Sequence, residues 1–203
     1  MTTPNSTPDT GLTTGWDLLD AAHAALLGTV RRVPADAWTR PTPCAEWNVT
    51  QVVQHAAGDQ LAFAAAITGG PGPDFNPFAP SGVIDGAPAD LLEPMVAACA
   101  AAWATVGADA ESVPVPVPPH ALPPAVGAGA AALDAAVHAW DIARATGQPS
   151  PLTPGLAVGL LDVARQIVEP LRQYGAYAPA IEGAGDDETA LLHYLGRDPH
   201  WTA

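Results

Sequence analysis

The sequence predicts an all-α protein built around a bundle of four long helices. Apolar residues recur at helical spacing in several long segments, and clusters of Gly and Pro separate these segments. The chain shows no internal repeat and no convincing run of strands. Its 203 residues are enough for one domain with a substantial core. We therefore expect a disordered, polar N-terminus over residues 1–12 and a single helical domain over residues 13–203.

The first helix is expected over residues 14–32, and Pro34 stops it. Its apolar positions recur three to four residues apart: Leu18, Leu19, Ala22, Leu26 and Val30. His23 falls inside this segment, where a lone histidine is more often a packed or surface residue than a metal ligand.

A second helix over residues 49–67 has the clearest start signal in the chain. Asn48 suits the N-cap position, and Gln51 stands where a capping box requires Glu or Gln. Trp47 and Val52 occupy the two positions of a hydrophobic staple. This start fixes the register of His55, about two turns into the helix.

The remaining helices follow from similar signals. Gly and Pro between residues 69 and 73 open an unusually long loop, which reaches to about residue 88. A third helix is expected over residues 90–106, with Asp90 as its cap and Glu93 as the N3 partner. The alternating Val and Pro of residues 113–119 favour a polyproline-like segment or a sheet edge.

The C-terminal third continues the helical pattern. The fourth helix is expected from residue 126 or 129 to 146. A fifth helix starts with Thr153 as N-cap and Pro154 at N1 and runs toward Pro170. A Gly-rich spacer then leads to a short helix over residues 187–194. Additional C-terminal helices thus accompany the bundle.

Composition excludes several classes of protein. Acidic residues number 21 against 7 basic ones, all Arg, so nucleic acid and anionic membrane surfaces would be repelled. No apolar stretch is long enough to span a membrane, and the N-terminus lacks a signal-peptide pattern. We expect a soluble, cytoplasmic protein. The absence of Lys and the excess of Ala, Gly and Pro indicate a GC-rich genome, such as that of an actinobacterium.

The two cysteines form no metal or redox motif. Cys44 and Cys99 are far apart in sequence, in a compartment expected to be reducing. Each is better explained as a buried small apolar residue. Cys44 keeps some interest because it precedes the helix that carries His55.

The most informative polar residues are Asp134, His138 and Asp141, at spacings of four and three in an otherwise apolar segment. This spacing places them on one face of a helix. Imidazole and carboxylate groups bind divalent metals, and His55 on a facing helix is the leading candidate to complete a site. The alternatives are a solvated helix face and hydrogen-bonded polar groups in the core.

Three segments resemble a known family. Residues 41–55 read PTPCAEWNVTQVVQH, residues 133–147 read LDAAVHAWDIARATG, and residues 191–199 read LLHYLGRDP. These resemble the DinB-like family, specifically the metal-binding N-terminal domain of mycothiol-dependent maleylpyruvate isomerases and its short single-domain actinobacterial relatives. The resemblance covers most of the chain and implies a DinB-like four-helix bundle with additional short C-terminal helices.

The resemblance implies a divalent metal held by His55, Asp134 and His138. Zinc is the first expectation, with nickel or another ion as an alternative. This chain has Asp134 where relatives usually have Glu. Asp141 is interpreted as a group outside the ligand set, holding a ligand imidazole or else paired with Arg144 or a backbone donor.

The family further implies mycothiol as a co-substrate. A metal-dependent enzyme that carries out thiol S-transfer or thiol-assisted isomerisation is then expected. The competing hypothesis is a non-catalytic bundle, with or without metal, that binds a small molecule or acts as a dimeric partner protein. A homodimer is compatible with either. No catalytic residue follows from the sequence, and the role of His120 stays open.

Overall fold

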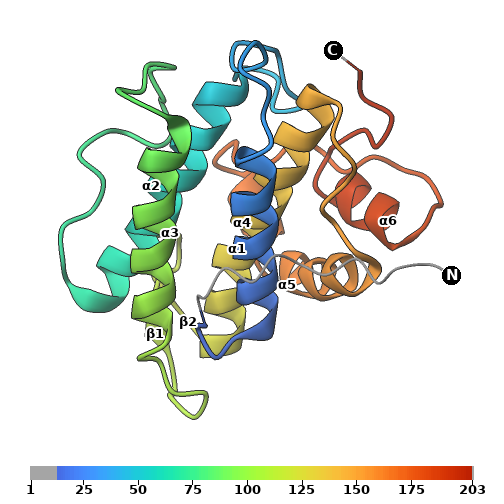
Figure 1. Ribbon diagram of the computed structural model, residues 1–203. Helices are drawn as coiled ribbons and strands as arrows, with labels where there is room; N and C mark the ends of the chain where they lie inside the picture. The colour runs from blue at the N-terminus through green and yellow to red at the C-terminus, as the bar shows by residue number, and fades with distance from the viewer. Residues whose placement is uncertain (1–12, 203) are drawn as a thin grey trace, which may run out of the picture.

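Four helices lie side by side in the computed structural model, which describes residues 13–202 (Figure 1). They are α1 (Asp17–Val30), α2 (Val49–Thr68), α3 (Pro88–Trp103) and α4 (Pro124–Thr146). The packed pairs include α1 with α4, α2 with α3, and α2 with α4. The predicted all-α bundle is confirmed. The expected disorder of residues 1–12 lies outside the described residues.

Two further helices lie on one side of the bundle, opposite the α2–α3 connection (Figure 1). The helix α5 (Pro154–Arg172) packs against α4 and α1, and α6 (Asp187–Tyr194) packs against α5. With 19 residues, α5 is as long as the helices of the bundle. It continues past Pro170, because a proline near the end of a helix removes one donor without stopping the last turn.

The capping signals of the sequence are confirmed at two helix starts and fail at a third, and α4 begins at Pro124, before the expected residue 126 or 129. Asn48 and Gln51 form the predicted capping box, and the Thr153 side chain caps α5. By contrast, α3 begins at Pro88 after Ala87, with no side-chain cap, so the prediction of Asp90 as the cap is wrong. Proline favours the first helical turn because its fixed φ suits a helix, which moves the start forward.

The Val and Pro segment forms the edge of a small sheet. The strand β1 (Val113–Pro114) pairs antiparallel with β2 (Ala121–Leu122). This hairpin lies at the end of the bundle where α4 begins (Figure 1). A Pro in a two-stranded sheet costs no ladder hydrogen bond when its nitrogen faces outward.

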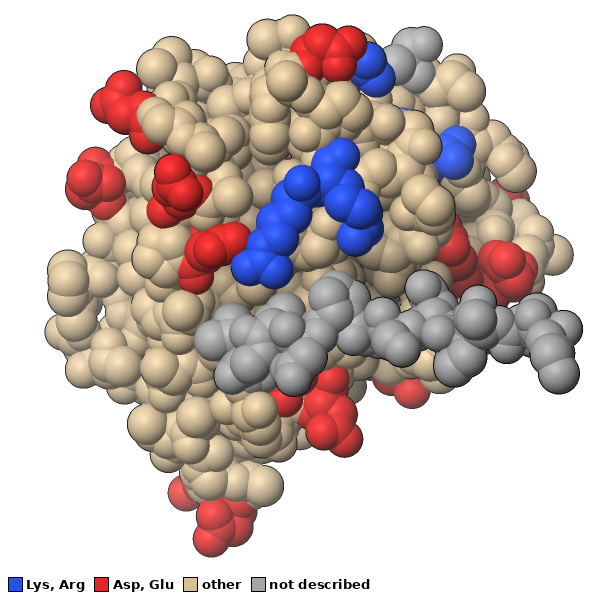
Figure 2. Space-filling model, in the orientation of Figure 1, with Lys and Arg blue, Asp and Glu red and all other residues tan. Residues whose placement is uncertain are grey.

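The core is built mainly from small and aliphatic side chains of α1, α2 and α4, with Trp103 and Trp140 as its largest fully buried members. Acidic side chains are spread around the face shown in Figure 2, while basic side chains form one cluster near its centre and lie singly at the top and the upper right. None of the helices between residues 13 and 202 combines the length and the apolar character that crossing a bilayer requires.

Candidate metal centre

Two helices of the bundle bring together the three residues that the sequence predicts as metal ligands. His55 lies on α2, and Asp134 and His138 lie one turn apart on α4. The Nε2 atom of His55 is 3.2 Å from Asp134 Oδ1, and the Nε2 atom of His138 is 3.4 Å from the same oxygen. The side chains of His55, Asp134 and His138 are only 8%, 13% and 9% exposed, respectively. Asp134 and His138 therefore do not belong to a solvated face of α4.

The donor set fits a divalent metal ion. Each residue offers one nitrogen or oxygen atom, and these three atoms lie within 4.8 Å of one another. Two ligands about 2.1 Å from a shared tetrahedral ion are about 3.4 Å apart. The separations of 3.2 and 3.4 Å have this size. Two imidazoles and one carboxylate form the ligand set of several catalytic zinc sites.

His55 is held by the long loop between α2 and α3. Its Nδ1 atom lies 2.9 Å from the carbonyl oxygen of Pro77. Because a carbonyl oxygen only accepts, Nδ1 donates and Nε2 faces Asp134 with its lone pair when the ring is neutral. The ring also packs against Trp47, with centroids 4.7 Å apart, and against Phe78 at 5.5 Å. The loop thus fixes both the tautomer and the orientation of the imidazole.

Asp134 is held by a buried amide from α2. The Nε2 atom of Gln60 donates to Asp134 Oδ2 at 3.4 Å and to the carbonyl oxygen of Ala131 at 3.1 Å. The Oε1 atom of Gln60 accepts from the Nε2 atom of His23 on α1 at 2.9 Å. Gln60 therefore contacts only Oδ2 of Asp134, and Oδ1 faces His55 and His138. His23 is a fully buried residue that contacts this amide.

His138 is held from its far side by Asp141. Its Nδ1 atom lies 3.0 Å from Asp141 Oδ2. Arg197 donates to both oxygens of the same carboxylate, from Nε at 3.0 Å and from Nη2 at 2.9 Å. The alternative partner considered from sequence, Arg144, instead donates to the carbonyl oxygen of Trp201.

The charges of the site reinforce one another. Burial opposes protonation of His55, but Asp134, Asp59 and the Pro77 carbonyl raise its pKa to about 9. Burial would raise the pKa of Asp134, but the adjacent His138 and His55 hold it below its usual value. Without a metal, a proton on His55 therefore supplies positive charge beside the carboxylate of Asp134.

Asp59 is a further acidic group close to the site. It lies one turn after His55 on α2 and is 6% exposed. Burial and the negative charge of Asp134 raise its pKa. The four-residue spacing from His55 was visible in the sequence, but its burial was not. Asp59 therefore adds a carboxyl group that favours its protonated form beside the ligand set.

Cys44 lies next to the centre without forming a convincing second one. Its sulfur, His138 and Asp141 offer donor atoms within 4.8 Å of one another. However, the Arg197 guanidinium already occupies Asp141, and a positive charge there disfavours a cation. Burial, with the charge of Asp141, raises the pKa of the Cys44 thiol to about 11. Cys99 is fully buried, as predicted.

The other residues singled out in the sequence lie outside the centre. His120 is exposed in the turn between β1 and β2 and has a φ of 69°. Trp140 is fully buried, and its Nε1 atom donates to Glu188 at 3.0 Å. Trp140 is therefore a core residue.

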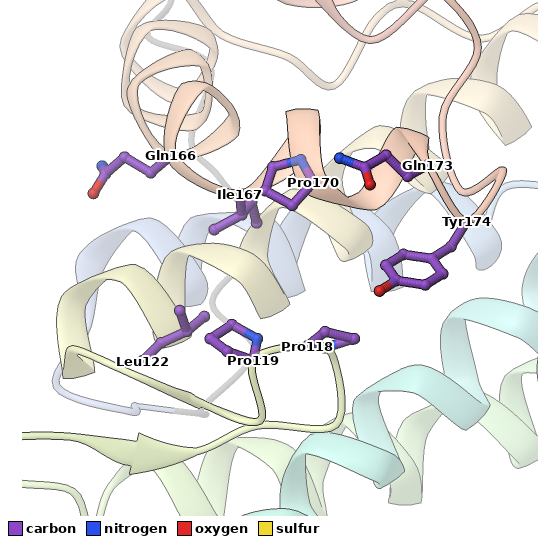
Figure 3. A pocket seen from close by; sticks show the side chains of 8 residues that line it. All are labelled: Pro118, Pro119, Leu122, Gln166, Ile167, Pro170, Gln173 and Tyr174. Carbon is purple, nitrogen blue, oxygen red and sulfur yellow. The ribbon is translucent and has the colours of Figure 1, made fainter.

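A cavity of about 300 Å³ lies apart from the ligand set, between the β1–β2 turn and the end of α5 (Figure 3). Its walls are mainly apolar, with two amides and one phenol. They consist of Pro118, Pro119, Leu122, Gln166, Ile167, Pro170, Gln173 and Tyr174. The lining contains neither an imidazole nor a carboxylate. We therefore place the candidate site at the histidines and not in this cavity.

Sequence reasoning missed Gln60, Arg197 and the Pro77 carbonyl. Gln60 carried no spacing signal, because an offset of five residues places it about 140° around α2 from His55. The contact between Arg197 and Asp141 spans 56 residues and depends on how the C-terminal segment folds back. A backbone carbonyl leaves no signature in the residue type.

Comparisons with known proteins identify a family and two relatives. The family described as Mycothiol maleylpyruvate isomerase N-terminal domain matches residues 19–143. Two uncharacterized proteins from Mycobacterium tuberculosis, of strains CDC 1551 / Oshkosh and H37Rv, are each 36% identical over 152 residues. These matches cover 73% of this chain and 75% of each relative. No solved structure matches the chain significantly.

Proposed function

The chain belongs to the family of mycothiol maleylpyruvate isomerase N-terminal domains, and on this premise we propose that it is a metal-dependent enzyme using a thiol co-substrate. His55, Asp134 and His138 hold a divalent ion, with zinc the first choice and nickel an alternative. The reaction is S-transfer or thiol-assisted isomerisation of a small molecule, and mycothiol is the thiol that the family suggests. The proposal depends mainly on the convergence of three buried donor atoms from two helices.

The chemistry of the donor set supports a catalytic role. Three protein ligands leave a coordination position open, as catalytic zinc sites do and structural sites do not. An ion held by these residues would supply a positive charge that favours the thiolate form of a thiol near neutral pH. The protein orients the ligands through Pro77, Gln60 and Asp141.

Aromatic side chains define one wall of the site. Trp47 stacks near both histidines, with ring centroids 4.7 Å from His55 and 6.4 Å from His138. Phe78 contacts His55 but is 67% exposed, so it offers an apolar surface beside the ligands. This arrangement suits a small molecule with an apolar part that covers Phe78 and displaces water.

Metal content tests the ligand assignment. We expect the purified protein to take up about one equivalent of Zn²⁺ per chain and the His55→Ala and His138→Ala variants to take up far less, because two-ligand sites bind weakly. Elemental analysis after dialysis measures this, and far-ultraviolet circular dichroism verifies that the helices persist. The exposed His200 provides the control, His200→Ala, which should retain the full equivalent. Full metal content in both ligand variants would contradict the assignment.

A thiol titration tests whether the centre binds a thiol through the metal, which the proposed enzyme requires. In the Co²⁺-loaded protein, mycothiol should produce a thiolate-to-metal charge-transfer band, since a thiol in the open position is deprotonated. S-methyl mycothiol is the matched control and should produce none. Identical spectra with both compounds would favour the non-catalytic hypothesis.

A further inference from the structure

A bidentate ion pair joins the C-terminal segment to Asp141, a residue that contacts a proposed metal ligand. The planar guanidinium of Arg197 donates two hydrogen bonds, one to each oxygen of this carboxylate. Asp141 is fully buried, and the Arg197 side chain is only 12% exposed. The carboxylate is thus buried and held at both oxygens.

We propose that Arg197 is a positioning residue for the metal centre, acting through Asp141 on His138. This inference rests on the proposed function, because it requires that His138 binds a metal. Asp141 Oδ2 accepts both from Arg197 and from Nδ1 of His138. The guanidinium fixes the plane of the carboxylate, and that plane fixes the direction in which His138 aims Nε2 at Asp134.

The local backbone places Arg197 where this contact is possible. Gly196, at the end of α6, has a φ of 76° and turns the chain sharply. A Cβ atom at this position would lie 2.7 Å from the carbonyl oxygen of Pro179, so only glycine fits. The amide of Arg197 then donates to the carbonyl oxygen of Leu192 at 2.8 Å. The turn is therefore shaped by a close backbone approach and directs Arg197 toward α4.

Arg197 lies outside the segment that the family match covers, which ends at residue 143. The three proposed ligands and Asp141 all lie within it. A segment that follows the matched domain in this chain therefore contributes to the centre. A buried ion pair is weak evidence for stability by itself, because desolvation offsets much of its attraction. The role that we propose for this ion pair is therefore to orient His138 and not chiefly to stabilise the fold.

Cobalt titration tests the proposal, with Co²⁺ as the probe and its visible absorption as the readout. We expect Arg197→Gln to weaken Co²⁺ binding by about 10- to 100-fold, the usual effect of removing a group that orients a ligand. Its visible spectrum should also change, since His138 is less well aligned. Arg197→Lys keeps the positive charge but loses the bidentate contact, so its Co²⁺ affinity should lie between that of the unaltered protein and that of Arg197→Gln.

Arg144 provides the matched control. It also binds the C-terminal segment, through the carbonyl oxygen of Trp201 at 2.9 Å, but the structure records no bond from it to Asp141. Arg144→Gln should therefore leave the Co²⁺ affinity and spectrum unchanged. An equal loss of affinity in Arg144→Gln and Arg197→Gln would show general loosening of the segment and overturn the proposal.

A double-mutant cycle shows whether Arg197 acts through Asp141. In the background of Asp141→Asn, the additional change Arg197→Gln should cost little further affinity. Additive losses, or wild-type affinity in Arg197→Gln, would overturn this inference and leave the proposed function standing. Failure of the unaltered protein to bind Co²⁺ would overturn both. If Arg197→Gln does not fold, the Co²⁺ affinity of Arg197→Lys is compared with that of the unaltered protein and of Arg144→Gln. An affinity of Arg197→Lys equal to that of the unaltered protein would then overturn the proposal.

Discussion

At the scale of single residues, each imidazole of the site has two nitrogens with separate tasks. The Nδ1 atoms donate to fixed acceptors, the Pro77 carbonyl for His55 and Asp141 for His138. The Nε2 atoms both face Asp134. Without these acceptors, either tautomer could form, and a proton on Nε2 would block metal binding. The contacts outside the ligand set therefore prepare the ligands for an ion.

The raised pKa of His55 predicts how the metal-free protein responds to pH. Its folded-state pKa of about 9 exceeds the ordinary 6.5, so its stabilising contribution is complete below about pH 6.5 and is lost as the pH rises through about 9. In chelator, the unfolding free energy of the wild type should thus fall relative to that of His55→Gln between about pH 6 and pH 10. Urea unfolding at several pH values measures this difference. A constant difference would contradict the predicted proton on His55.

At the scale of elements, the long α2–α3 loop packs directly on α2 because Gly58 has no side chain. A Cβ atom at Gly58 would lie 2.7 Å from Cγ of Pro77 and 2.9 Å from Cε2 of Phe75. The same loop supplies the carbonyl that holds His55, one turn earlier on the helix. The glycine therefore lets the loop approach closely enough to reach the imidazole.

Gly58→Ala should push the loop away from α2. We expect a loss of about 1–3 kcal/mol of unfolding free energy, as for other overpacked sites, together with weaker Zn²⁺ binding. Chemical denaturation and metal titration measure the two effects. Gly155→Ala in α5 is the control, because nothing lies within 4 Å of a Cβ there. A Gly58→Ala protein with unchanged metal affinity would show that the loop does not position His55.

At the scale of the whole molecule, the centre joins parts of the chain that are distant in sequence. Its proposed ligands lie on α2 and α4, Gln60 links α4 to α1 through His23, and Arg197 adds the segment after α6. An ion held here connects α2 directly to α4. Metal binding should therefore stabilise the complete domain against unfolding.

Zn²⁺ should raise the melting temperature in a concentration-dependent way. At a free concentration about 100 times Kd, a ligand specific for the folded state adds about 3 kcal/mol. For a protein of this size that corresponds to a rise of roughly 5–10 °C. Differential scanning calorimetry measures the shift, which should be absent in His138→Ala. An equal shift in that variant would indicate binding at another place.

The helices and their capping follow largely from the sequence. The sequence predicted the helices, most of their boundaries and the capping box of α2, because these depend on local periodicity and on side chains that bond within one turn. It also placed Asp134 and His138 on one face of α4. The start of α3 was missed, because Pro88 overrode the capping signal of Asp90.

What the sequence by itself determined is the set of helices and the faces that carry His55, Asp134 and His138, since helical geometry converts spacing into direction. Only the tertiary structure decided that these faces meet in a buried place and that Gln60, Pro77 and Arg197 hold the ligands. Packing of helices and closure of loops bring together atoms separated by tens of residues. The local sequence does not specify which of these distant atoms come into contact.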